Sequence, residues 1–131
     1  KTNLSFSPGF VASNAMTYKL KDNFQISLLS KYVGEQFMGN LESIVSKNDV
    51  LKSYFVNDLN ATYVINTTKI FKSITFSALI NNIFNTEYIS NGYYYTYDDT
   101  WSVAGTTTTL DGAGYYPQAT RNFLIGATFK F

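Results

Sequence analysis

The chain has 131 residues, of which 15% are charged and 18% are aromatic, and its formal net charge is +1. This length fits one ordinary domain, and the small net charge gives no electrostatic basis for binding nucleic acid. Because the sequence contains no Cys and no His, it excludes disulfide frameworks, thiolate nucleophiles, His-based zinc sites and Ser-His-Asp triads. No uninterrupted apolar run approaches the roughly 18 residues that predict a transmembrane helix.

The first two strands are predicted over residues 10–20 and 24–37, where apolar and polar side chains alternate with the period of a strand. The turn between them, Lys21-Asp22-Asn23, is short and polar. The second strand leads into a longer connection over 38–52, in which residues 41–45 suit a short helical turn. The apolar faces of these two strands carry Phe10, Ala12, Met16 and Tyr18, and then Phe24, Ile26, Leu28 and Tyr32.

Two further strands are predicted over 53–65 and 73–88, with a short connection over 66–72 between them. In the fourth strand the alternation slips at Asn81-Asn82, which predicts a β-bulge. Residues 90–119, rich in Gly, Tyr, Thr and Asp, are predicted to form a long loop. The apolar faces of these strands carry Leu59, Ala61, Tyr63 and Ile65, and then Ile74, Phe76, Ala78 and Ile80.

The last predicted strand runs from Phe123 to Phe131 and gives a total of about five. Its odd-numbered face is wholly apolar and its even-numbered face is mixed. The sequence therefore predicts an all-β fold of antiparallel, up-and-down strands. The two faces carry Phe123, Ile125, Ala127, Phe129 and Phe131, and Asn122, Leu124, Gly126, Thr128 and Lys130.

Charged side chains within the predicted strands all lie on the face opposite the apolar one. Lipid-facing positions exclude charge, as does the core of a β-sandwich, so this regularity alone leaves both architectures open. The connections alternate between short and long and aromatic residues stand near strand ends, and both features favour an outer-membrane barrel. The charged residues are Lys19, Lys31, Glu35, Asp58 and Lys130.

About five strands cannot close a barrel, because bacterial single-chain barrels contain at least about eight and lipid does not tolerate open sheet edges. The membrane interpretation therefore predicts that the chain is one piece of a larger barrel. If the last strand runs toward the periplasm, the turns at 21–23 and 66–72 are periplasmic. The connections 38–52 and 90–119 then lie outside the cell.

Three segments resemble the C-terminal region of TonB-dependent outer-membrane receptors. Residues 81–88, Asn-Asn-Ile-Phe-Asn-Thr-Glu-Tyr, are similar to the Asn-Leu-Phe-Asn-x-x-Tyr segment of that family. Residues 31–37 are similar to its Tyr-x-Gly-x-Gln-Tyr strand end, and residues 116–123 to its Pro-x-x-Arg-x-Phe approach to the last strand. Asn91-Gly92-Tyr93 resembles Bacteroidetes-type members, and order and spacing agree over nearly the whole chain, to the terminal Phe131.

The resemblance implies a transmembrane barrel of about 22 strands in the bacterial outer membrane, filled by a plug domain. Residues 1–131 would supply its C-terminal part, without the plug and most strands. Such a receptor imports a scarce nutrient, such as a siderophore, a cobalamin-like compound or another small ligand. Its partners would be outer-membrane lipid, the rest of the receptor, TonB acting through the plug, and the barrel-assembly machinery. The family's terminal aromatic strand implies an assembly signal formed by Phe123, Phe129 and Phe131.

Aromatic residues in the predicted loop are the candidate ligand-binding residues, because their rings offer stacking area and hydroxyl hydrogen bonds. An interfacial girdle or packing of the loop would also explain them. The acid cluster Asp98, Asp99 and Asp111 offers oxygen ligands for a cation such as Ca²⁺, but a solvated loop is the favoured explanation, so no metal or cofactor is predicted. The ligand-binding candidates are Tyr93, Tyr94, Tyr95, Tyr97, Trp101, Tyr115 and Tyr116.

Two other classes of protein remain as alternatives. The first is a secreted, soluble antiparallel β-sandwich that binds a glycan or a protein through the aromatic loop. The second is an enzyme, which is not expected because the sequence offers no His, no Cys and no paired carboxylates on strands. Strands of about nine residues or more with a charge-free face would favour lipid over a sandwich core.

Overall fold

The computed structural model describes residues 4–39, 49–67 and 70–131 of the chain. The described residues form an antiparallel all-β fold, which confirms the predicted class. They contain no helix with the length and apolar character needed to cross a membrane. The described strands are β1 Val11–Lys21, β2 Phe24–Val33, β3 Gln36–Phe37, β4 Val50–Leu51, β5 Tyr54–Asn66, β6 Ser73–Asn81, β7 Ile89–Asp99, β8 Thr108–Pro117 and β9 Asn122–Lys130.

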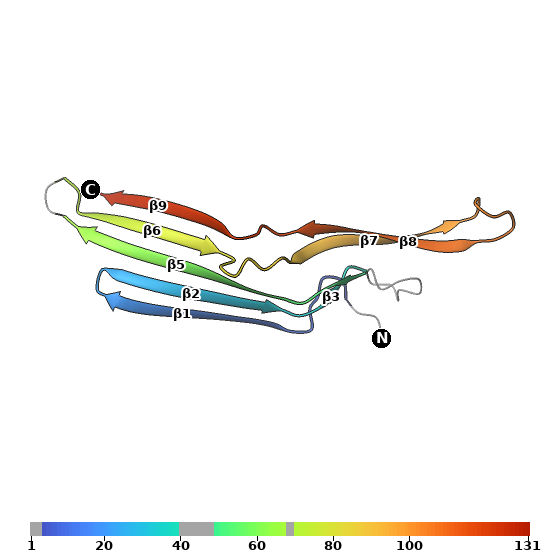
Figure 1. Ribbon diagram of the computed structural model, residues 1–131, viewed down its shortest axis with the longest axis horizontal. Helices are drawn as coiled ribbons and strands as arrows, with labels where there is room; N and C mark the ends of the chain where they lie inside the picture. Colours follow the sequence, from blue (N-terminus) through green and yellow to red (C-terminus); the bar gives the residue numbers. More distant parts are fainter. Residues whose placement is uncertain (1–3, 40–48, 68–69) are drawn as a thin grey trace. The chain divides into compact units, whose positions relative to one another are not determined.

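The chain divides into two compact units, here called the sheet unit and the hairpin unit. The sheet unit comprises residues 12–32, 55–86 and 119–131. It holds a five-stranded sheet in the order β1-β2-β5-β6-β9, in which β1 and β9 are the edge strands (Figure 1). These are the five strands that the alternation of side chains predicts.

The antiparallel register of β5, β6 and β9 places apolar side chains opposite one another in every second row. Directly paired residues lie on the same face of a sheet, so the apolar faces of the three strands merge into one. The apolar rows are Ile65–Ile74–Phe129, Tyr63–Phe76–Ala127, Ala61–Ala78–Ile125 and Leu59–Ile80–Phe123.

Contacts between side chains extend this face across β2 and β1. On the apolar side, the rings of Phe24 and Tyr63 meet edge to face with 6.1 Å between their centroids. On the opposite side, Gln25 Nε2 donates to Thr62 Oγ1 at 3.4 Å, and Thr17 and Ser27 share a hydrogen bond of 2.9 Å between their hydroxyls. The sheet thus has one mainly apolar face, interrupted by the hydrogen bond from Ser30 Oγ to Asn57 Oδ1 at 2.6 Å. The other face is mixed, includes the Leu79–Leu124 pair, and is here called the polar face because it carries the charged side chains.

Two predicted strands end earlier than their alternation suggests. β2 stops at Val33, and Gly34 donates its backbone N–H to the carbonyl of Phe10 at 2.8 Å, so Gln36–Phe37 forms a separate strand. β6 stops at Asn81 because Asn82 adopts a left-handed backbone with φ 53°. The predicted bulge at Asn81-Asn82 is therefore wrong: the chain leaves the sheet at that point.

The hairpin unit comprises residues 1–11, 33–54 and 87–118, of which 4–11, 33–39, 49–54 and 87–118 are described. Its two sheets are the short pair β3–β4 and the longer hairpin β7–β8 (Figure 1). The predicted loop at 90–119 is thus wrong. Alternating Tyr and Thr residues favour a strand there, while the Gly and Asp content misleadingly suggests a loop.

Among the described residues, buried apolar side chains are few and lie mainly in the hairpin unit. Val33, Met38 and Leu51 belong to that unit, and Leu51 is only 1% exposed. In the sheet unit, Val56 is the buried apolar residue among those described. The five-stranded sheet is therefore a layer whose apolar face lacks a buried core. The predicted helical turn at 41–45 lies outside the described residues, as do residues 68–69 of the short connection at 66–72.

Candidate functional site

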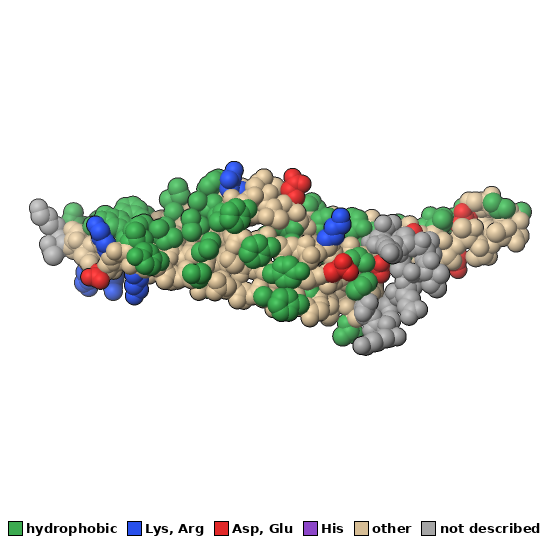
Figure 2. Space-filling view, turned by 60° about the horizontal axis from the view of Figure 1, so that its bottom comes forward, with side chains coloured by type: hydrophobic (Ala, Val, Ile, Leu, Met, Phe, Trp, Pro, Cys, Tyr) green, Lys and Arg blue, Asp and Glu red, His purple; other side chains and the backbone are tan. Residues whose placement is uncertain are grey.

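Large apolar side chains stand exposed on the apolar face of the sheet. Ile125 is 81% exposed and Phe123 is 67% exposed, and both belong to the apolar rows on the edge strand β9. Figure 2 shows hydrophobic side chains gathered over the sheet, with Lys and Arg side chains most numerous at its left end and others further along. Exposed apolar surfaces of this kind are typical of interfaces with a membrane or with another protein. Other exposed members are Met16, Tyr18, Leu20, Tyr63, Ile65, Phe76 and Phe129.

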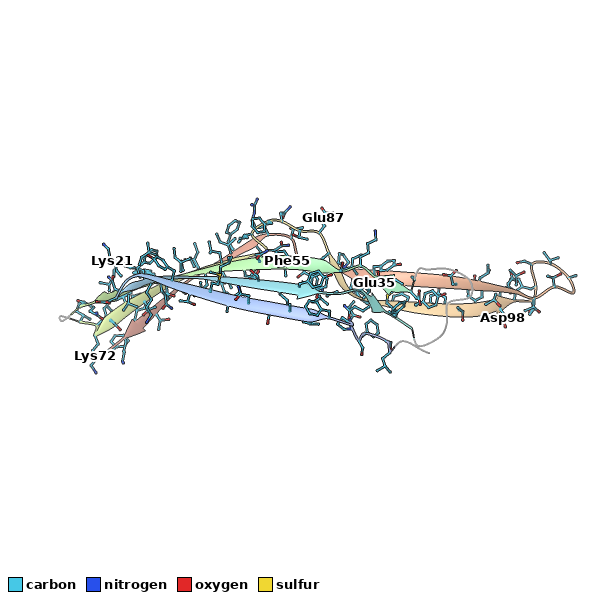
Figure 3. All side chains as sticks on the ribbon, turned by 90° about the horizontal axis from the view of Figure 1, so that it is seen from below. Lys21, Glu35, Phe55, Lys72, Glu87 and Asp98 are labelled. Atoms are coloured by element: carbon cyan, nitrogen blue, oxygen red, sulfur yellow. The ribbon has the colours of Figure 1, made fainter. Side chains whose placement is uncertain are left out.

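Charged side chains of the five strands all occupy the polar face. Lys31 and Asp58 share the parity of Gln25 and Thr62, which meet across that face. Lys21 and Lys72 lie at the end of the sheet that carries the β1–β2 turn (Figure 3). The charge segregation expected from the sequence is therefore present in the folded sheet.

The C-terminal aromatics are brought together in part. The ring of Phe71 lies 5.3 Å from that of Phe129 and 5.0 Å from that of Phe131, measured between centroids. The backbone N–H of Lys72 donates to the carbonyl of Lys130 at 2.7 Å, which fixes this end of β9 beside β6. Phe123 lies at the other end of β9, opposite Ile80, so the three predicted assembly residues do not form one cluster.

The Asn82–Thr86 turn explains the physical role of the Asn-x-x-Asn pattern. Asn82, only 4% exposed, donates from Nδ2 to the carbonyl of Thr86 and accepts the Thr86 N–H at Oδ1, at 2.8 and 2.9 Å. Its own N–H donates to Asp58 Oδ1 at 2.8 Å. Asn85 also has a left-handed φ of 57°, a conformation that Asn tolerates better than most residues. The turn is thereby tied to β5.

Two of the three segments that carry the family resemblance meet in space. The backbone N–H of Arg121 donates to Asn85 Oδ1 at 3.0 Å, within the sheet unit. In the hairpin unit, the N–H of Gln118 donates to the carbonyl of Tyr88 at 3.0 Å, and the Tyr88 ring stacks on Tyr54 with centroids 4.4 Å apart. Hydrogen bonds of backbone and side-chain groups therefore join residues 81–88 to residues 116–123.

The seven aromatic candidates of the hairpin separate onto its two faces. The register pairs Tyr93 with Gly114 and Asn91 with Tyr116, so Tyr116 shares a face with Tyr93. Tyr94 and Tyr115 alternate onto the opposite face. The residues on the first face are here called the aromatic row. It consists of Tyr93, Tyr95, Tyr97, Trp101 and Tyr116.

Rings of the aromatic row are evenly spaced and nearly parallel. Successive centroid distances are 6.2 Å from Tyr93 to Tyr95, 6.3 Å from Tyr95 to Tyr97, and 6.5 Å from Tyr97 to Trp101. The corresponding angles between ring planes are 18°, 24° and 11°. The spacing follows from the backbone, because alternate residues of a strand are about 6.6–6.8 Å apart. Tyr116 is tilted by 52° against Tyr93.

Glycines on β8 provide the space over which these rings lie. A Cβ at Gly112 would come within 2.5 Å of the Tyr95 ring, and one at Gly114 within 2.4 Å of the Tyr93 ring. Only a residue without a Cβ allows the rings to reach across the hairpin at this height. The Gly residues that suggest a loop in the sequence therefore shape the aromatic row.

Asp99 stabilises the turn after β7 that carries Trp101. Its Oδ1 accepts the backbone N–H groups of Trp101 at 3.1 Å and Ser102 at 3.0 Å. Hydrogen bonds from Ser102, through its side chain and its backbone, hold the pKa of the Asp99 carboxyl below its usual value. Because the carboxylate is the form that accepts these bonds, Asp99 remains charged at neutral pH and orders the turn.

The three carboxylates of the acid cluster do not lie on one face of the hairpin. Asp99 belongs to the face of the aromatic row, whereas Asp98 and Asp111 alternate onto the other face. Asp98 Oδ1 accepts the hydroxyl of Thr109 at 2.7 Å. Within residues 4–39, 49–67 and 70–131, no three acidic side chains are grouped so as to hold a metal ion.

The sequence alone does not identify three residues that shape these surfaces, Phe71, Gly112 and Gly114. Phe71 lies in a connection, where strand parity makes no prediction, yet its ring contacts both terminal aromatics. Gly112 and Gly114 are visible only as loop-forming residues until the strand pairing is known. The alternation of Tyr93, Tyr95 and Tyr97 is the signal that would have revealed β7.

Comparison of the chain with models of protein families, with curated proteins and with solved structures finds no match. The resemblance to TonB-dependent receptors thus rests on the chain's own segments and on their arrangement.

Proposed function

We propose that the chain forms the C-terminal strands of a TonB-dependent receptor barrel in the bacterial outer membrane. In this role it contributes to the wall of a transporter that takes up a scarce nutrient from outside the cell. The observation that carries the proposal is the apolar face of the sheet. It extends over five strands, is exposed, and bears no charged side chain among the described residues.

The strand lengths support this proposal. The five strands of the sheet contain between 9 and 13 residues. A tilted strand needs about 9–11 residues to cross the hydrocarbon region of a bilayer. Each strand is thus long enough to cross a bilayer with its apolar side chains toward lipid.

The edges of the sheet indicate what else such a barrel requires. β1 and β9 are the two edge strands, and each presents one row of backbone groups that the sheet leaves unpaired. In lipid an open edge is excluded, because unsatisfied backbone groups cost several kcal/mol each. The proposal therefore requires further strands of the receptor next to β1 and β9.

The arrangement of the motif segments adds independent support. Residues 81–88 and 116–123 are two of the three segments that carry the resemblance, and hydrogen bonds join them at Asn85 and Arg121 and at Tyr88 and Gln118. Spacing along the sequence and contact in the fold are separate observations. Their agreement favours a shared structural role over a chance match of short motifs.

A secreted β-sandwich accounts less well for the sheet. A sandwich buries the inner face of each sheet against the other. The apolar face of this sheet is instead exposed, with Ile125 and Phe131 among its most accessible residues. In water such a face would lead to association.

Detergent dependence tests the proposal. We expect the purified chain to aggregate in buffer and to be dispersed by detergent micelles, as followed by size-exclusion chromatography and circular dichroism. A complete receptor that contains residues 1–131 should resist extraction from lipid by alkaline carbonate, because its further strands pair with the edges at β1 and β9. A monomeric, folded chain in detergent-free buffer would contradict the proposal and favour the sandwich.

A further inference from the structure

We infer that the aromatic row on the β7–β8 hairpin binds a neutral oligosaccharide from the surrounding medium. The inference rests on the proposed function for the hairpin's exposure outside the membrane, and it deepens that function by naming the class of ligand. The juxtaposition that carries it is a row of exposed, evenly spaced rings on one face of a hairpin that bears only acidic charges.

The chemistry of the row matches that of sugars. Tyr95 is 52% exposed and Trp101 is 72% exposed, so the rings are accessible to a ligand. Each Tyr combines an apolar ring with a hydroxyl, and Trp combines a larger ring with an N–H donor. A pyranose has the complementary character, because apolar C–H groups alternate with hydroxyls around its ring. Stacking on the rings and hydrogen bonding at their polar ends are therefore available to one ligand.

The repetition of the rings favours a chain of sugars over a single one. Tyr93, Tyr95, Tyr97 and Trp101 repeat every 6.2–6.5 Å. A monosaccharide covers one or two of these rings, and its single contact is too weak to offset the entropy lost on binding. An oligosaccharide presents similar units in succession, so several stacking contacts form together for one loss of translational freedom.

The charges of this region select against anionic ligands. The sequence contains no Lys or Arg between residues 73 and 120, whereas Glu87, Asp98, Asp99 and Asp111 all lie in that stretch. The resulting negative field repels carboxylated and phosphorylated ligands, including nucleic acids. A hydroxyl-rich ligand without charge is not repelled, and its hydroxyls can donate to the nearby carboxylates.

The row is also organised before any ligand arrives. Gly112 and Gly114 leave the space over which the Tyr95 and Tyr93 rings lie, and Asp99 fixes the turn that carries Trp101. Side chains already held in place lose less conformational entropy on binding. A preformed row of this kind suits recognition by stacking.

The test uses Trp101, the only Trp in the sequence, as a reporter within the site. Purified chain in detergent micelles is titrated with cellohexaose and with maltohexaose, while tryptophan fluorescence and calorimetric heat are recorded. We expect at least one of these neutral hexamers to bind saturably and to shift Trp101 emission, and glucose to bind at least about tenfold more weakly. Tyr95→Ala should weaken hexamer binding about 3- to 10-fold, the range expected for losing an aromatic contact.

Tyr115→Ala is the matched control, because Tyr115 lies on the opposite face of the same hairpin and is similarly exposed. Its hexamer affinity should stay within about twofold of the unaltered chain. Tyr95→Phe should keep most of the affinity, because it keeps the ring. Equal losses in Tyr95→Ala and Tyr115→Ala, with circular dichroism unchanged, would overturn the assignment to the aromatic row.

Charged probes distinguish the inferred ligand class from others. A hexamer of galacturonate tests anions and a hexamer of glucosamine tests cations. The inference is overturned if neither neutral hexamer binds by calorimetry up to millimolar concentration, or if a charged hexamer binds more tightly than both. Absence of hexamer binding defeats the inference alone, whereas a monomeric, folded chain in detergent-free buffer defeats the proposed function.

Discussion

The sheet unit and the hairpin unit both expose aromatic side chains, but of different chemistry. The apolar face of the sheet is mainly aliphatic and Phe, with a few Tyr, and its exposed members include Ile125 and Phe76. The aromatic row of the hairpin uses Tyr and Trp, with carboxylates nearby. The difference teaches that exposure alone does not define a function. A mainly aliphatic surface without charges suits hydrocarbon, whereas a row of rings with polar ends beside carboxylates suits a ligand in water.

The largest effect should come from placing a charge on the apolar face. Ile125→Lys introduces an ammonium on the proposed lipid side, at a cost of about 2–4 kcal/mol near the bilayer midplane. Leu124→Lys is the matched control, because Leu124 is the preceding residue, is also exposed, and has the opposite parity. Urea titration of a complete receptor that contains residues 1–131, folded in vesicles, should show a large loss of stability for the first variant and a small one for the second. Equal losses would remove the distinction between the two faces.

Next in size is the effect of Asn82→Ala. This change leaves the Thr86 N–H and carbonyl without their side-chain partners and puts a Cβ-bearing residue that lacks a polar side chain at φ 53°. A loss of about 1–3 kcal/mol in the free energy of unfolding is expected. Asn82→Gly separates the two causes, because it removes the hydrogen bonds but tolerates the left-handed backbone. Asn82→Ala should thus be the less stable of the two variants, and the reverse order would contradict this account of the turn.

A smaller effect is expected from the aromatic cluster at the end of the sheet. Phe71→Ala removes the ring that contacts Phe129 and Phe131, and each such contact is worth about 0.5–1.5 kcal/mol. In a receptor expressed in cells, Phe71→Ala and Phe131→Ala should both lower the amount of protein in the outer membrane, as measured on heat-modifiability gels. Phe84→Ala, which alters an exposed ring in the Asn82–Thr86 turn, is the control. Unchanged levels for Phe131→Ala would show that the terminal aromatic is not an assembly signal.

The smallest predicted effect belongs to the hairpin. In Gly112→Ala, the added Cβ meets the outer end of the Tyr95 ring, which must shift. Hexamer binding should weaken about threefold while the fold is retained, since only a flexible side chain moves. Ala113→Ser on the opposite face should bind like the unaltered chain. If Gly112→Ala also leaves affinity unchanged, the position of the Tyr95 ring does not matter for binding.

The sequence predicts the sheet unit well, because one apolar face forces a strict alternation. Parity alone groups Ile74, Phe76 and Ile80 with Phe123 and Phe129, and the register confirms that they share rows. Periodicity is less informative where burial on one face does not dominate. In the hairpin, both faces carry Tyr, and Gly and Asp residues are typical of turns as well as of twisted ribbons.

Contacts outside strands are harder still to predict. The side chain of Asn82 turns back onto Thr86, and the ring of Phe71 meets β9, only because the register brings those segments together. The motif of residues 81–88 indicates that Asn82 and Asn85 matter but not that they adopt left-handed conformations. Propensities describe single residues, whereas these contacts depend on which strands are neighbours.

The most direct test of the account measures which face of β9 contacts lipid. In a complete receptor that contains this chain, single Cys residues can be placed in turn at positions 122–130 and spin-labelled in vesicles, since the chain itself contributes no Cys. The account predicts a period of two: labels at the odd positions 123–129 collide with lipid-soluble oxygen, and those at even positions with a water-soluble nickel chelate. Equal access of the chelate to both sets would contradict the claim that the apolar face of the sheet lies in the membrane.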